Sequence, residues 1–282
     1  MQPAAKLVAG HPAALPQAGV LTVALALAGL VLVATPGESW RMPVLLVLGL
    51  LLGATLYLTA FGFTAAYRNL VVHRDVAGVR AQIVMLALAS MLFAPVLAVG
   101  SVFGHAVTGA VAPVGPQVAI GAFMFGLGMQ LAGGCGSGAL YTAGGGSLRM
   151  IVVLVAFCAG SFWATLHMGS WQRLPAWGEI ALGEMLGWPA ALAVQFAVLA
   201  AIWALLGRFA RGPDPRSSNL LRLPARDLLI GAVLLAVLNF LVLIVAGHPW
   251  TITWAFSLWG AKSAQFIGWE PAAGGFWNCK RN

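Results

Sequence analysis

A single cysteine, Cys135, lies within a run of glycines in the stretch GMQLAGGCGSGALYTAGGG, between Gly128 and Gly146. Long apolar segments flank this stretch on both sides. A thiol can act as a nucleophile, a metal ligand or a weak hydrogen-bond donor, and glycines let a ligand approach the backbone closely. This stretch is therefore where binding or chemistry is expected.

The other sequence patterns around thiols and glycines exclude several kinds of site. Cys135, Cys158 and Cys279 are far apart and show no Cys-x-x-Cys or Cys–His spacing, so neither a disulfide framework nor a metal site is predicted, and no cofactor is expected. No strand precedes the glycine run and no Gly-Lys-Ser/Thr follows it, unlike a nucleotide-binding loop. Ser137 lacks the G-x-S-x-G spacing of a hydrolase nucleophile.

The composition of the chain is typical of a membrane protein. Of its 282 residues, 61% are hydrophobic and 8% are charged, whereas about a quarter of the residues in a soluble domain are charged. Apolar windows that reach or approach the length of a membrane span recur along the chain. They cover Gly19–Thr35, Met42–Ala60, Ile83–Phe103, Gln117–Ala132, Leu148–His167, Gly187–Gly207 and Leu228–Gly247, with a Trp-rich stretch at Thr251–Trp259.

These windows predict an all-α integral membrane protein. They are continuous apolar runs without the alternation of a membrane β-barrel, and only helices or closed barrels satisfy the backbone inside a bilayer. We expect residues 1–282 to form a single transmembrane domain, a polytopic bundle of seven or eight helical segments surrounded by the lipid bilayer. No convincing cleavage site follows the first window, so we expect that helix to be retained.

The net charge is +8, and many of the arginines gather near residues 66–80 and 208–227. Positive residues beside apolar windows mark the cytoplasmic side, so both stretches are predicted to be cytoplasmic loops separated by an even number of crossings. The basic excess is thus explained by topology, and no nucleic-acid partner is expected.

All seven acidic residues lie at or near the ends of apolar windows. Cation carriers and cation channels usually mark their path with carboxylates within the membrane, and acid–base catalysis there needs them too. Their absence from the window centres disfavours a cation pathway and an enzyme, and favours an anionic or a neutral, polarisable solute.

The helix before Cys135 is predicted to break inside the membrane. Gln117–Ala132 reaches about 24 Å at 1.5 Å per residue, short of the ~30 Å hydrocarbon core, before the glycines begin. Such breaks survive only inside protein or beside a wet cavity, and transporters use them to direct free N–H groups at an anion. The residues expected to bind substrate in a pore are Gly133, Gly134, Cys135, Gly136, Ser137 and Gly138.

The stretch FMFGLGMQLAGGCGSGALYTAGGGSLRM resembles the signature of the YeeE/YedE family of sulfur-compound membrane transporters, which includes thiosulfate permeases. Weaker similarity in FGFTAAYRNLVVHRD and WTITWAFSLWGAKSAQFIGWEP extends the resemblance over roughly Arg41 to Trp277. It implies an inverted-repeat-like pore with re-entrant half-helices in the cell inner membrane, where cysteines pass the anion along through transient S–H···S contacts. It also implies a small cytosolic sulfurtransferase as a possible partner.

The chain departs from the family pattern in two places. Only Cys135 matches a family cysteine, because the first-repeat cysteine expected near YRNLVVHRD is missing. The chain ends FWNCKRN, where Cys279 has no glycine setting, so the second repeat is expected to be shortened at the C-terminus.

The sequence therefore favours an inner-membrane permease that takes up thiosulfate or a related inorganic sulfur anion, with Cys135 as the recognition point. Two alternatives remain. A membrane-embedded thiol redox enzyme or sensor needs a cationic neighbour or a resolving thiol, and Arg149 and Cys158 are far from Cys135 in the sequence. A non-conducting truncated scaffold is the other alternative.

Overall fold

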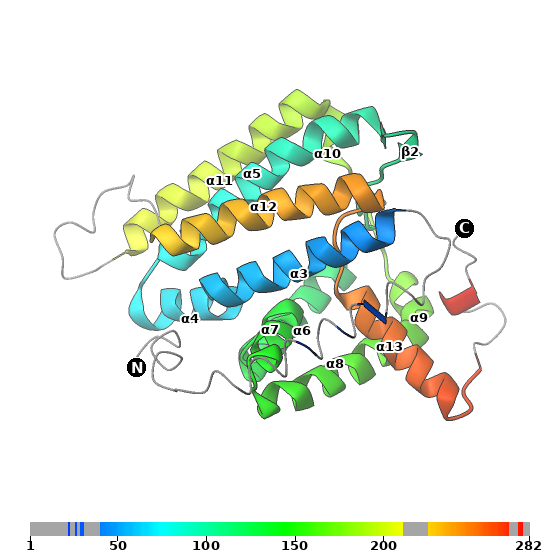
Figure 1. The fold of residues 1–282 in the computed structure, drawn as a ribbon. Coiled ribbons are helices and arrows are strands. Elements are labelled where there is room, and N and C mark those ends of the chain that lie inside the picture. The colour runs from blue at the N-terminus through cyan, green and yellow to red at the C-terminus, as the bar shows by residue number, and fades with distance from the viewer. Residues whose placement is uncertain are drawn as a thin grey trace.

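The computed structural model describes Thr22, Ala26, Gly29, Leu30 and residues 40–210, 225–270 and 276–278. Helices dominate this part of the chain (Figure 1). The elements are α3 (Arg41–Thr59), α4 (Phe63–His73), α5 (Ala77–Val99), β1 (Ser101–Val102), β2 (His105–Ala106), α6 (Pro116–Ala132), α7 (Gly136–Gly144), α8 (Leu148–Leu166), α9 (Met168–Gln172), α10 (Leu182–Leu186), α11 (Trp188–Phe209), α12 (Arg226–Ala246), α13 (Thr253–Phe266) and the 3-10 turn η2 (Phe276–Asn278).

Six helical stretches in the described residues are long and apolar enough to cross a membrane. They are Arg41–His73, Ala77–Val99, Pro116–Gly144, Leu148–Leu166, Trp188–Phe209 and Arg226–Ala246. The chain is therefore an all-α, multi-pass membrane protein, as its composition predicts. The first and third of these stretches each contain a break, between α3 and α4 and between α6 and α7.

Most of the predicted windows match the observed helices closely, but two differ. The Trp-rich stretch expected at Thr251–Trp259 is α13, which continues to Phe266. The window expected at Ile83–Phe103 is α5, which begins earlier, at Ala77. The reason is local: Asp75 Oδ1 accepts a hydrogen bond from the Ala77 N–H at 2.9 Å, which forms a turn that leads the chain into the helix. At the other end Gly100 takes a left-handed conformation and stops α5. Cys279 and most of Gly19–Thr35 lie outside the described residues.

The basic stretch near residues 66–80 is not the loop that its charge predicts. α4 continues to His73 and α5 begins at Ala77, which leaves only Arg74, Asp75 and Val76 between two helices. Arg80 is 3% exposed, with its guanidinium carbon 4.9 Å from the centre of the Trp203 ring. A long arginine side chain can lie along apolar helices in this way, so charge alone misplaces the loop. Four of the candidate spans separate this stretch from Arg208, the even number expected.

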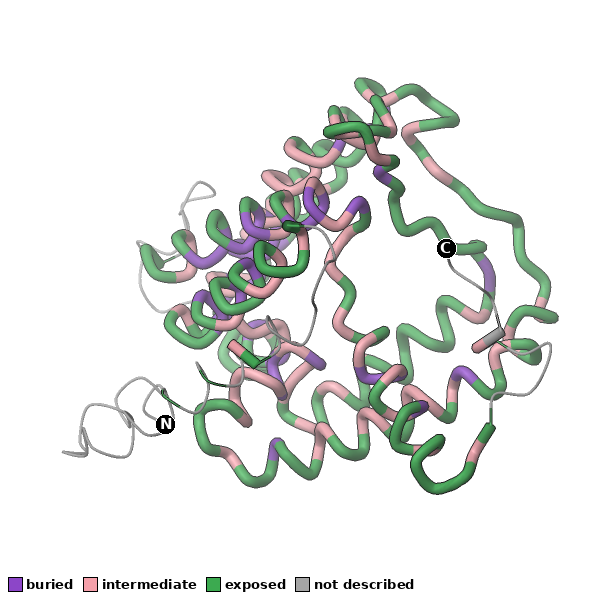
Figure 2. Tube along the Cα trace, turned by 45° about the vertical axis from the view of Figure 1, so that its right-hand side comes forward, coloured by how far each residue is buried: buried purple, intermediate pink, exposed green. Residues whose placement is uncertain are grey.

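The best-packed part of the structure surrounds α12, which lies against α3 and α5 (Figures 1 and 2). Its buried side chains form a cluster with those of α3, α5 and the α3–α4 link. The members are Leu48, Leu52, Leu56, Phe61, Ala81, Ala232, Leu235, Leu238, Val242 and Val245. Polar N–H and C=O groups stay inside the helices, so close packing of small and branched side chains supplies the contacts between them.

A second group of helices consists of α7, α8 and α13, in which α8 packs against both of the others. Phe157 of α8 and Phe256 of α13 meet edge to face, with ring centres 4.7 Å apart. By contrast, α6 buries none of its residues in the described part of the chain. The short α7 also contacts α3 and so connects the two groups.

Close approach of α12 to α3 depends on Gly231. A Cβ atom placed there would lie 2.7 Å from Thr59 Oγ1, and Thr59 cannot turn away without losing its 2.7 Å hydrogen bond to the Thr55 carbonyl.

Gly231→Ala is expected to lower the free energy of unfolding by about 1–3 kcal/mol through overpacking, measured by thermal unfolding in detergent. Gly121→Ala in α6, where an added Cβ meets nothing within 4 Å, is the control; equal stability of both variants would contradict this account.

Candidate functional site

The helix break predicted around Cys135 is present. α6 ends at Ala132, and Gly133 follows in the left-handed conformation at φ 82°, where its N–H donates to the Met129 carbonyl at 3.1 Å. A left-handed residue at this position is the usual way to end a helix, and glycine adopts it without strain. Cys135 has extended backbone and begins α7. The chain thus changes direction over three residues, 133 to 135.

The thiol of Cys135 is half-buried and lies beside a hydroxyl. Its Sγ is 3.3 Å from Ser137 Oγ, and either atom can be the donor. A Cβ atom placed on Gly138 would be 3.5 Å from the same sulfur, so the thiol lies against the bare backbone of that residue. The sulfur is therefore held at the first turn of α7 by two small neighbours.

The remaining glycines of the motif allow other close contacts. A Cβ on Gly134 would lie 3.1 Å from the Ala139 nitrogen, which is tighter than ordinary packing allows. Gly136 is buried, and a Cβ there would meet Ile252, Phe157 and Phe256 at 3.4–3.5 Å. Glycine at these positions lets the break fold back on itself and lets α7 pack against α8 and α13.

The N-terminus of α7 has donors that its own helix does not use. The first intrahelical bond runs from the Ala139 N–H to the Cys135 carbonyl at 2.7 Å, so the N–H groups of Gly136, Ser137 and Gly138 precede the helical ladder. Partial positive charge gathers at such an end, which favours an anion. The thiol, the Ser137 hydroxyl and these N–H groups form one set of uncharged donors.

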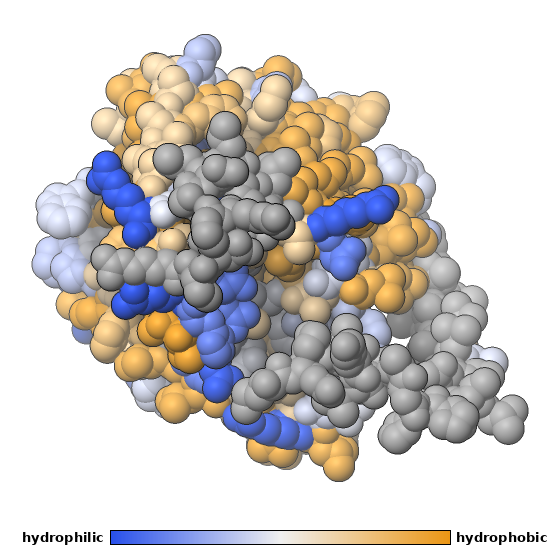
Figure 3. Space-filling view, turned by 90° about the vertical axis from the view of Figure 1, so that its left-hand side faces the viewer, coloured by the Kyte–Doolittle hydropathy of each residue, from blue (hydrophilic) through white to orange (hydrophobic). Residues whose placement is uncertain are grey.

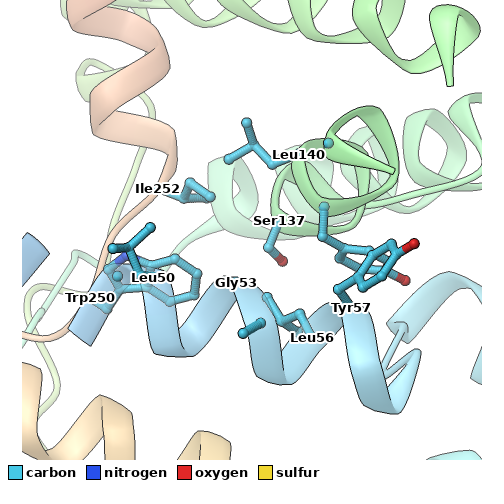
Figure 4. A pocket seen from close by; sticks show the side chains of 12 residues that line it. Leu50, Gly53, Leu56, Tyr57, Ser137, Leu140, Trp250 and Ile252 are labelled. Atoms are coloured by element: carbon cyan, nitrogen blue, oxygen red, sulfur yellow. The ribbon is translucent and has the colours of Figure 1, made fainter. Parts of the chain in front are cut away.

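A cavity of about 450 Å³ lies between α3, α7 and the segment that leads into α13 (Figure 4). Ser137 is directed from α7 towards Gly53 and Leu56 of α3, and Trp250 and Ile252 close the other side. The lining is mainly apolar, contains no charged residue, and includes Tyr57 and Tyr141. Cys135 is not part of this lining; it is linked to the cavity through its contact with Ser137.

The break between α3 and α4 repeats the break between α6 and α7. Ala60 ends α3 in the left-handed conformation at φ 47°, and Gly62, two residues later, has extended backbone and begins α4. Gly133 and Cys135 have the same spacing and conformations. Gly62 thus occupies the position before α4 that Cys135 occupies before α7, and it lies ahead of the stretch YRNLVVHRD, near which the first-repeat cysteine was expected. A Cβ atom placed on Gly62 would lie 3.3 Å from the Tyr141 hydroxyl. Tyr141 of α7 thus brings the α6–α7 break next to the α3–α4 break.

The structure brings the six predicted residues together at one helix break but divides them by environment. Gly136 and Gly138 are buried, Gly134, Cys135 and Ser137 are half-buried, and Gly133 is exposed.

Several residues that line the cavity were not predicted from the sequence. They are Tyr57, Tyr141, Trp250, Ile252, and Gly49 and Gly53 of α3. The Gly49–Gly53 spacing of one helical turn was the available signal.

Residues 58–280 match the family described as sulphur transport. This match covers most of the chain. The chain belongs to the sulphur transport family, which is the YeeE/YedE family. Membership assigns it to transport of sulphur compounds. Among curated proteins, none matches the chain significantly.

The break at Gly133 gives a prediction about stability. An alanine at φ 82° would be strained by about 1–2 kcal/mol, so Gly133→Ala is expected to lower the free energy of unfolding by that amount. Gly126→Ala, on the same helix with open space around an added Cβ, should leave it unchanged or raise it slightly. Thermal unfolding of both variants in detergent checks this; if Gly133→Ala matches wild type, the left-handed turn is not required.

Proposed function

We propose that this chain is a permease of the cell inner membrane that takes up thiosulfate or a related inorganic sulfur anion. The observation that supports this best is the start of α7, where a half-buried thiol, a hydroxyl and unused N–H groups share one helix break. Family membership supports a sulphur compound as the solute. Thiosulfate is favoured because it combines negative charge with a terminal sulfur atom.

The chemistry of this donor set suits transient recognition of such an anion. A neutral thiol is a weak hydrogen-bond donor that can contact a soft sulfur atom, and helix N–H groups complement negative charge. A fixed cation would hold the anion more strongly, and conduction needs sites weak enough to release it. The cavity lined by Ser137 has no charged residue, in keeping with a pathway of weak sites.

The proposed route passes between the two helix breaks. Gly62 and Tyr141 lie next to each other, and Tyr141 also lines the cavity with Ser137. A solute in that cavity would contact the start of α7 on one side and α3 on the other. On the cytoplasmic side, a small sulfurtransferase that consumes the imported sulfur is the proposed partner.

The thiol role predicts a loss of uptake on replacement of Cys135. Removing one weak hydrogen bond of about 1 kcal/mol should lower uptake about fivefold, so Cys135→Ala is expected to transport thiosulfate about five times more slowly, and Cys135→Ser to fall between it and wild type. The measurement is growth and radiolabelled uptake, with thiosulfate as sole sulfur source, in a host that lacks its own thiosulfate permeases. Cys158→Ala is the matched control, because Cys158 lies in the middle of α8.

The outcomes test the identity of the solute and the role of the Cys135 thiol separately. Failure of the wild-type chain to support uptake, although it is present in the membrane, would overturn thiosulfate as the solute. Uptake by Cys135→Ala at the wild-type rate would leave the permease but overturn the thiol role. Equal losses in Cys135→Ala and Cys158→Ala would indicate a general effect on folding.

The cavity gives a second prediction about transport. Gly53 lines it, and a Cβ there meets nothing within 4 Å, so the leucine of Gly53→Leu can extend into the space without displacing the backbone. Gly53→Leu is expected to reduce thiosulfate uptake several-fold while the protein remains folded. The control is Gly121→Leu in α6, which makes the same change at a position that also has open space around an added Cβ but does not line the cavity. Unchanged uptake in Gly53→Leu would show that the solute does not pass through this cavity.

A further inference from the structure

A groove with a basic edge runs between α4 and α11 on the outside of the helix bundle. It consists of two adjoining hollows of about 350 Å³ each, which share Arg74, Leu205 and Phe209 in their walls. Arg208 borders one hollow, and Leu70 and Ile202 line the other. We call this feature the α4–α11 groove. It combines a long apolar surface with two arginines at one end.

Both arginines stand at the same boundary of the membrane-spanning segments. Arg74 directly follows the span that ends at His73, and Arg208 is in the last turn of the span that ends at Phe209. Both side chains are exposed. Figure 3 faces this end of the molecule, where hydrophilic side chains lie among apolar ones. The groove therefore begins where lipid headgroups meet the protein and continues along the hydrocarbon region.

Asp75, which directly follows Arg74, contacts other groups and does not line the groove. Asp75 accepts the Ala77 N–H at 2.9 Å and lines a separate small cavity beside Gln82. The described residues that line the groove include no acidic side chain, and neither Arg74 nor Arg208 forms an ion pair with any of the described residues. The positive charge at the groove is thus available to an external anion.

The packing beneath the groove gives it a defined shape. Leu206 is buried in its floor and packs in a cluster with Ala66 of α4 and Val79 of α5, with Leu70 and Trp203 against them. The guanidinium of Arg80 lies over the Trp203 ring inside this layer and does not reach the groove lining. Among the described residues of the lining, Arg74 and Arg208 are the two cationic side chains.

We propose that the α4–α11 groove binds one anionic phospholipid, with its phosphate between Arg74 and Arg208 and an acyl chain along Leu70, Ile202 and Phe209. Basic pockets between transmembrane helices recognise anionic headgroups, and guanidinium groups match phosphate oxygens. The apolar walls bury acyl chain that a free anion lacks. This lipid connects α4, which begins at Phe63, to α11, and the inference is independent of the proposed solute.

The test uses the full chain purified in mild detergent and offered equal amounts of phosphatidylglycerol and phosphatidylcholine, with bound lipid counted by native mass spectrometry. Wild type is expected to retain phosphatidylglycerol in preference. Each arginine near a headgroup contributes about fivefold to affinity, so the double variant Arg74→Gln/Arg208→Gln should bind phosphatidylglycerol at least tenfold more weakly. The control, Arg68→Gln/Arg226→Gln, removes the same charge from exposed positions on α4 and α12 outside the groove and should change affinity less than twofold.

Three results would overturn the proposal. Equal retention of the two lipids by wild type would exclude headgroup selection. Equal losses in both double variants would mean that general surface charge, and not the groove, attracts the lipid. Full displacement of phosphatidylglycerol by inorganic phosphate alone would assign the arginines to a free anion.

Discussion

A backbone N–H or C=O group in hydrocarbon has no water to pair with, and this constraint decides where the helices of this protein can end. Both breaks within apolar spans use the same solution. A left-handed residue, Ala60 or Gly133, returns its N–H to the preceding helix, and an extended residue starts the next one. The N–H groups in the first turn of α4 and of α7 then have no partner within their own helix. The constraint thus places N–H donors without a partner in their own helix at the two breaks within the apolar spans.

The helices divide into a well-packed group and a second group that contains the thiol. α12 with α3 and α5 forms a buried group, and much of the packing lies there. α7 is short, carries the thiol, and lies between α3 and α8. The cavity beside Ser137 therefore has one wall from the rigid group and one from the broken helix. A donor set on a short helix held against a well-packed neighbour can be positioned without a charged residue to fix it.

The membrane class, most helix limits and the break at Cys135 could be predicted because each depends on local composition: apolar length, glycine and left-handed caps. The environment of Arg80 could not be predicted, because Arg80 lies over the ring of Trp203, which is far away in the sequence. Likewise Ser137 and Cys135 were predicted, whereas Tyr57, Gly53 and Trp250 became neighbours of Ser137 only through packing of α3 and the α12–α13 link. The repeat of the break at Gly62 was hidden because it depends on backbone conformation, which Ala60 adopts without glycine.

The exposure of α6 has a consequence for how the protein responds to its membrane. This helix has 17 residues, buries none of them, and is about 25 Å long, less than the ~30 Å of an average hydrocarbon core. Because none of its residues is buried in the described part of the chain, the surrounding lipid influences its height more than that of the well-packed helices. A thicker bilayer covers more of the turn at Gly133, and a thinner one leaves it closer to water. Acyl-chain length in the surrounding membrane is therefore expected to change the hydration of the Cys135 thiol.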